Sequence, residues 1–197
     1  TGYLQNPQQI GYGYEAPGST VARPAGDKLT WRFLAPNVHD FMWAADPEYR
    51  HLVRQVVNGP TLHVLYKNKT GNPRNDTAWT EVANAAVTVL PYIEREFGTY
   101  PYKQYSFIHG GDGGMEYPMG TLLSGPGLGT VFHEWMHTWY QMLMATNESL
   151  YAWMDEGFTD WATQRVSAFY RETVTRPRLS GNAVALKKLD SAAAELP

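Results

Sequence analysis

The stretch that decides the interpretation of this sequence runs from Val131 to Trp139 and reads VFHEWMHTW. Apolar residues recur at helical spacing from Leu128 to Leu143, which predicts an amphipathic helix. Positions i and i+4 of a helix lie on one face, so His133 and His137 are expected to point the same way. Two imidazoles placed in this way can bind one zinc ion, and Glu134 between them suits a general base rather than a ligand.

A catalytic zinc site needs a third protein ligand and one open position. Glu156 follows His137 after 18 intervening residues, near the start of a second helix predicted over about 151–170. Antiparallel packing of the two helices would bring Glu156 opposite the histidines. Asp160 lies one turn later, so its carboxylate is expected to accept the ring N–H of a ligating histidine. Asp155 is expected not to face the metal and to act only at the helix N-terminus.

Outward from this pair of helices, the pattern predicts a mixed α+β fold. Strands are expected at 29–34, 61–66 and 105–109, with an extended segment at 119–123 after a glycine-rich loop at 110–114. Another helix is expected to begin at Asp76 or Thr77, to be kinked or divided by Pro91 and to stop at Gly98. The second helix of the pair should bury a set of apolar residues: Trp153, Phe158, Trp161, Ala162, Val166 and Phe169. Residues 1–27 are expected to be irregular, and 187–196 favour a helix.

Composition narrows the function classes. Hydrophobic residues make up 43% of the 197-residue chain, which is enough for a core, and the formal net charge of −3 gives no reason to expect a nucleic-acid partner. Cysteine is absent, so disulfides and thiolate metal sites are excluded. No stretch is apolar for long enough to span a membrane. Thr1 is not a natural initiator and no signal peptide follows it, so we expect a mature or trimmed chain.

A second informative segment precedes the histidines and reads GGMEY, from Gly113 to Tyr117. Sixteen residues separate Glu116 from His133. The two glycines allow a substrate backbone to approach closely, and an extended segment here could pair with a peptide. The Glu116 carboxylate would then stand at the end of the cleft, where it suits a free α-ammonium group.

Together, the spacing HExxH-x18-E and the GGMEY segment resemble the aminopeptidase N family of gluzincin zinc metallopeptidases (metallopeptidase family M one). The second segment is similar to that family's GxMEN motif, and residues 37–41 and 43–46 look like its junction between two domains. The resemblance implies a thermolysin-like catalytic domain, with a small mixed sheet lobe beside a helical lobe. It assigns 1–45 to the end of an N-terminal β-domain with its junction, and 46–197 to a catalytic domain that is incomplete at its C-terminal side.

Carried over residue by residue, the resemblance implies a zinc-dependent hydrolase that removes the N-terminal residue of peptides with a free N-terminus. One zinc ion per chain would be held by His133, His137 and Glu156. Glu134 would be the general base and Glu116 the amine anchor. Three further residues would line the substrate cleft: Gly113, Gly114 and Met115. The other domains of a longer parent enzyme would be partners, and the family favours an extracytoplasmic bacterial location.

The sequence departs from the family pattern at two points. Tyr117 stands where the motif has Asn, and the tyrosine that stabilises the oxyanion in the family is expected beyond Pro197. A fragment without that tyrosine is expected to be weakly active or inactive. Two alternatives therefore stay open: a related endopeptidase without the N-terminal restriction, and a zinc-stabilised module that binds without cleaving.

Overall fold

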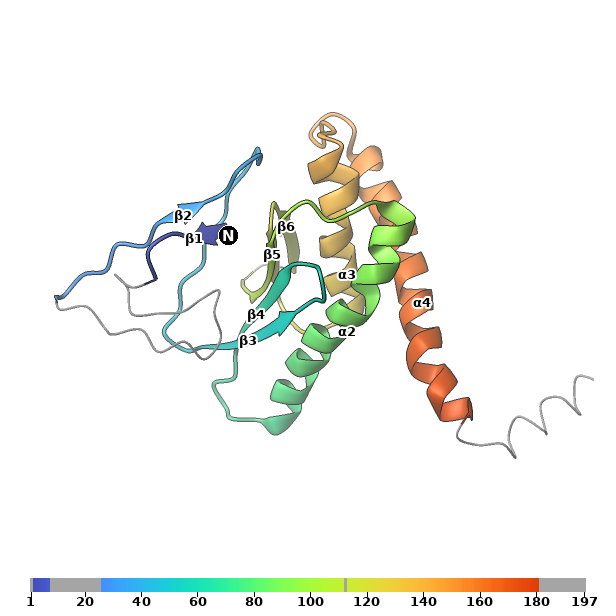
Figure 1. Cartoon of the computed structure of the whole chain (residues 1–197), viewed down its shortest axis with the longest axis horizontal. Coiled ribbons are helices and arrows are strands. Elements are labelled where there is room, and N and C mark those ends of the chain that lie inside the picture. Colours follow the sequence, from blue (N-terminus) through green and yellow to red (C-terminus); the bar gives the residue numbers. More distant parts are fainter. Residues whose placement is uncertain (1, 8–25, 112, 181–197) are drawn as a thin grey trace, which may run out of the picture.

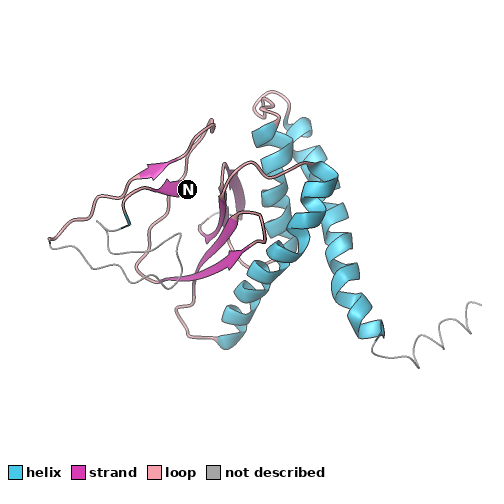
Figure 2. Cartoon of the chain, in the orientation of Figure 1, coloured by secondary structure: helices cyan, strands magenta, loops and turns pink. Residues whose placement is uncertain are grey.

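The computed structural model describes residues 2–7, 26–111 and 113–180, with the side chains of the last helix described as far as residue 174. The described part is a mixed α+β structure, as expected, in which a five-stranded sheet packs against three α-helices. Figures 1 and 2 show the helices α2, α3 and α4 on one side of the sheet, with a small two-stranded ribbon on the other side. None of the described helices is long and apolar enough to cross a bilayer.

The sheet has the strand order β3-β4-β5-β7-β6. Its strands are β3 (Tyr49–Gln55), β4 (Thr61–Lys67), β5 (Gln104–His109), β6 (Gly114–Tyr117) and β7 (Gly120–Leu123). The pairs β4–β5 and β5–β7 are parallel, whereas β3 and β6 run antiparallel to their neighbours. The central strand β5 is buried over almost its whole length, as expected for a parallel strand covered on both faces. β6 lies at an edge of the sheet, which matters for the candidate site.

Helix α2 (Pro73–Phe97) connects the parallel strands β4 and β5. It begins earlier than expected, because Asn72 caps it by accepting a hydrogen bond from the Arg74 N–H and Pro73 occupies its first turn. The prediction that Pro91 divides the helix is wrong, since the helix runs unbroken to Gly98. Buried neighbours on either side of Pro91 hold the helix against the core. Gly98 ends it with a φ of 107°, as its position predicted.

The two helices around the histidines form an antiparallel pair with a wider π-helical turn at each facing end. Helix α3 (Leu128–His137) continues into η1 (Thr138–Leu143), and η2 (Trp153–Gly157) leads into α4 (Phe158–Ser180). The expectation that Trp153, Phe158 and Trp161 are buried is wrong, because they are 64%, 41% and 51% exposed. Only the stripe through Ala162 and Val166 enters the core, where α4 packs against α2 and α3.

The layers of the molecule are therefore the sheet, then α2 and α3, then α4 (Figure 1). Aromatic side chains fill the space between the sheet and the helices α2 and α3, and the largest are Trp79, Tyr105, Phe107 and Trp135. On the opposite face of the sheet, β1 (Tyr3–Leu4) pairs with β2 (Phe33–Leu34). The strand expected at 29–34 is thus only two residues long, and β1 lies in a region expected to be irregular. The helix favoured at 187–196 falls outside the described residues.

Candidate metal centre

Helix α3 holds the two histidines one turn apart, and their rings point toward a common position. The Nε2 atoms of His133 and His137 lie 3.2 Å apart. Val131, Phe132, Trp135 and Met136 anchor the helix in the core, so its histidine face is fixed by packing. His137 is 1% exposed, whereas His133 remains partly open to solvent.

Glu156 reaches the same position from η2. Its Oε2 atom lies 3.0 Å from Nε2 of His133 and 3.7 Å from Nε2 of His137. A tetrahedral zinc ion with bonds of about 2.0–2.1 Å would hold its ligand atoms about 3.3 Å apart, which is close to the three distances here. These three side chains therefore form a group that could hold a metal ion, as their spacing in the sequence predicted.

Each histidine also has a carboxylate at its other ring nitrogen. Nδ1 of His137 lies 2.6 Å from Oδ1 of Asp155, and Nδ1 of His133 lies 3.3 Å from Oδ1 of Asp160. Such pairs fix the ring orientation and place the proton on Nδ1, which leaves the Nε2 lone pair free for a metal. The structure thus brings Asp160 to His133, as the sequence suggested.

The expectation for Asp155 is wrong. Its side chain is buried and contacts His137 instead of serving only the helix N-terminus. Asp155 and Glu156 are adjacent in a π-helical turn, which accounts for this contact. The wider turn lets Asp155 contact Nδ1 and Glu156 approach Nε2 of the same His137 ring. Thr159 was also missed, and its hydroxyl lies 3.3 Å from Nδ1 of His137. The only feature of the sequence that could have indicated the contact of Asp155 with His137 was its place beside Glu156 at the start of the second helix.

Burial sets the charge of the His137–Asp155 pair. It lowers the pKa of His137 to about 4, helped by the neighbouring His133, and it raises the pKa of Asp155. Both shifts disfavour the charged forms, so the His137 ring is neutral at pH 7 and in the state that a metal requires.

Glu134 lies on α3 beside the histidines, and its carboxylate rests against strand β6. A Cβ atom added to Gly114 would lie 2.1 Å from Oε1 of Glu134, so the carboxylate rests directly on the glycine backbone. Burial raises the pKa of Glu134 to about 8, and the carboxylates of Glu116, Glu156 and Asp155 contribute to the rise. Such a group binds a proton readily, as a general base must.

Glu116 lies on β6, two residues after Gly114, and therefore on the same face of the sheet. Its carboxylate belongs to a second close group with Glu134 and His137, whose nearest ligand atoms are all within 4.8 Å of one another. Burial raises the pKa of Glu116, and the charges of Asp155 and Glu156 add to this. The cluster therefore concentrates carboxyl groups beside the histidines, and a cation bound there would favour their ionised forms.

The other residues expected in the cleft are less closely placed. Met115 and Tyr117 alternate with Glu116 along β6, so their side chains leave the opposite face of the strand. Gly113 has open space where a side chain would be, in contrast to Gly114. Of the two glycines, only Gly114 is thus needed to let another side chain, that of Glu134, approach the backbone closely.

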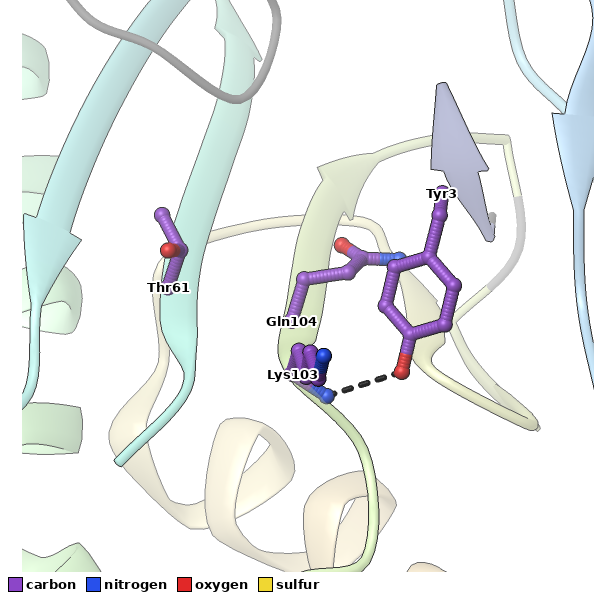
Figure 3. Close-up of a pocket in the computed structure, with 4 residues that line it drawn as sticks. All are labelled: Tyr3, Thr61, Lys103 and Gln104. Carbon is purple, nitrogen blue, oxygen red and sulfur yellow. Dashed lines mark hydrogen bonds between the residues drawn. The ribbon is translucent and has the colours of Figure 1, made fainter. Parts of the chain in front are cut away.

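A separate hollow of about 360 Å³ lies at the start of β4 and β5, between the sheet and β1 (Figure 3). Its lining residues are Tyr3, Thr61, Lys103 and Gln104. The backbone N–H of Lys103 donates to the Tyr3 hydroxyl across 2.9 Å, which ties β1 to the sheet. The hollow includes none of the metal-centre residues. The candidate site is therefore identified by the chemistry of its side chains and not by this hollow.

Comparison with known protein families and with curated proteins identified no match to this chain. The likeness to aminopeptidases therefore rests on the residues themselves and on the geometry just described.

Proposed function

We propose that this chain is the metal-binding catalytic part of a zinc-dependent aminopeptidase with a thermolysin-like fold. One observation carries the proposal: three donor atoms from His133, His137 and Glu156 lie 3.0, 3.2 and 3.7 Å apart, as a tetrahedral zinc ion requires. The carboxylates on both Nδ1 atoms support it, because a metal-ligating histidine almost always donates its other ring N–H to a carboxylate, a backbone carbonyl or water.

The donor set favours zinc among divalent metals. Two imidazoles and one carboxylate are the ligands of catalytic zinc in other peptidases, whereas calcium and magnesium prefer oxygen alone. When bound, zinc supplies Lewis acidity, which polarises a scissile carbonyl and acidifies a water molecule. The side chain of Glu156 is 59% exposed, so a substrate can reach the proposed metal position from the solvent side.

The role of Glu134 follows from its position beside the ligands. It takes the proton of the attacking water and passes it to the departing amine, since a carboxylate with a raised pKa can both accept and return a proton. Gly114 holds the carboxylate against β6, so the base faces the strand along which we expect the peptide to lie.

The restriction to N-terminal residues rests on strand β6. Among the described strands β6 pairs only with β7, so its other edge can accept a peptide by strand addition. Glu116 is on the face of β6 that meets Glu134 and His137. Its carboxylate would bind the α-ammonium group of the substrate and place the first peptide bond at the metal.

The test combines metal content with hydrolysis in the full-length protein. We expect about one zinc per chain and chelator-sensitive release of a fluorophore from aminoacyl substrates. Glu134→Gln should keep the zinc and lose turnover, because Gln cannot accept the proton. A Glu134→Gln variant that retains full activity would refute the mechanism.

The same assay separates the alternatives. A peptide with an acetylated N-terminus should be cleaved far more slowly than the free peptide, and Glu116→Gln should abolish this difference. Equal rates for both peptides in the unaltered protein would indicate an endopeptidase. Stoichiometric zinc with no hydrolysis of a broad aminoacyl library would indicate a module that binds without cleaving.

A further inference from the structure

The proposed base Glu134 and two hydroxyl side chains, those of Tyr105 and Thr138, are buried together. Tyr105 is 0% exposed, Thr138 2% and Glu134 6%. Within the described residues, the Tyr105 hydroxyl, Thr138 Oγ1 and Glu134 Oε2 are buried without a hydrogen bond of ordinary length and angle. Buried polar atoms without partners carry a large desolvation cost, so three of them in one place indicate a shared role.

The topology brings these groups together. Glu134 and Thr138 are four residues apart and lie on the same side of the helix. Tyr105 projects from β5 toward that helix, and its ring packs 5.5 Å from the ring of Trp135. Phe107, on the same face of β5, contacts Trp135 as well.

Electrostatics agree with this placement. Burial raises the pKa of Tyr105 well above its ordinary value, and the negative charge of Glu134 raises it further. The Thr138 hydroxyl, which is near enough to interact with the Tyr105 oxygen as a hydrogen-bond donor, opposes the rise. Tyr105 therefore stays protonated and keeps an O–H that can donate.

We propose that Tyr105 and Thr138 are positioning residues for Glu134, whose hydroxyls hold its inner oxygen Oε2 through one enclosed water molecule. This inference rests on the proposed function only in naming Glu134 the base. A water molecule suits the place, because interior waters bridge buried polar groups that have no other partner. Oε1, held over Gly114 on the other side, is then kept in line with the substrate.

Positioning has a kinetic signature that packing lacks. Tyr105→Phe and Thr138→Val remove one hydroxyl each and retain most of the side-chain volume. We expect each to lower kcat by about tenfold with KM unchanged, because the base is displaced while substrate binding persists. Thr138→Ser, which restores the hydroxyl, should recover most of the loss. An unchanged kcat in both hydroxyl-free variants overturns the proposal.

Tyr100 offers a matched control. It is also buried, its ring lies 6.0 Å from that of Tyr105, and its hydroxyl donates to the Gln104 carbonyl instead of facing the base. Tyr100→Phe should therefore leave kcat unchanged, even where it lowers stability. A loss in kcat equal to that of Tyr105→Phe would show that the effect is general to buried tyrosines, and this also overturns the proposal.

A second readout needs no enzymatic activity. We expect Tyr105→Phe to shift the urea midpoint of unfolding in the unaltered protein and to shift it less in a Glu134→Leu background, since the shared interaction is already lost there. Equal shifts in both backgrounds overturn the inference. The protein could show no hydrolysis while the two urea-midpoint shifts still differ. In that case the proposed function fails, and the interaction of Tyr105 with Glu134 stands.

Discussion

Replacing Gly114 with Ala tests the arrangement of the site most directly. The new Cβ would lie 2.1 Å from Oε1 and 2.7 Å from Cδ of Glu134, whereas ordinary contacts begin near 3.4 Å. The carboxylate must therefore move by about 1 Å, and a misplacement of that size can lower a rate by about 100-fold. This corresponds to about 2.7 kcal/mol of lost transition-state stabilisation.

The assay is kcat/KM on an aminoacyl fluorophore, with zinc content and the urea midpoint measured in parallel. Zinc should stay bound, because Glu134 is not among the three ligands proposed here. Gly113→Ala is the control, since a Cβ at this neighbouring glycine meets no atom within 4 Å and neither glycine has a positive φ. If Gly114→Ala kept kcat/KM within about twofold of the unaltered protein, the seating of the base on β6 would be refuted.

Two further predictions concern the histidines. Asp155→Ala should weaken zinc binding by about 10–100-fold in a chelator competition, and Asp160→Ala should weaken it less because its contact is longer and exposed; equal losses would contradict the ranking. Away from the site, burial lowers the pKa of His63 to about 3 and of His51 to about 4. The unfolded chain protonates these rings near pH 6.5, so their contribution to stability is complete above that pH and declines as the pH falls toward 3. For His63 the slope is at most about 1.4 kcal/mol per pH unit. Urea midpoints between pH 7 and 4 should fall less steeply for His63→Gln; identical slopes would refute the assignment.

The sequence predicted the parts of the site that depend on local geometry alone. His133 and His137 share a face because they are one helical turn apart, and a short connection to an antiparallel helix brings Glu156 opposite them. The same logic placed Asp160 near one of the histidines, which the structure shows to be His133. These relations hold wherever the helix pair forms, so no knowledge of the sheet was needed.

What the sequence did not predict depends on tertiary context. Asp155 was misplaced because regular helical spacing does not anticipate a π-helical turn. Strand β3 was missed because its segment contains two arginines and a histidine, and it becomes a strand through pairing with β4. Trp153 and Trp161 were expected to be buried, but periodicity cannot reveal which apolar faces another element covers.

The division of the site between two parts of the fold has a further consequence. The candidate metal ligands and their carboxylate partners all lie between residues 133 and 160, on one helical hairpin, whereas Gly114 and Glu116 lie on the edge strand β6. Changes on the strand can therefore alter which peptide is accepted without touching the ligands. For protein engineering, β6 is thus the segment in which to vary specificity, with the hairpin left as an invariant chelating unit.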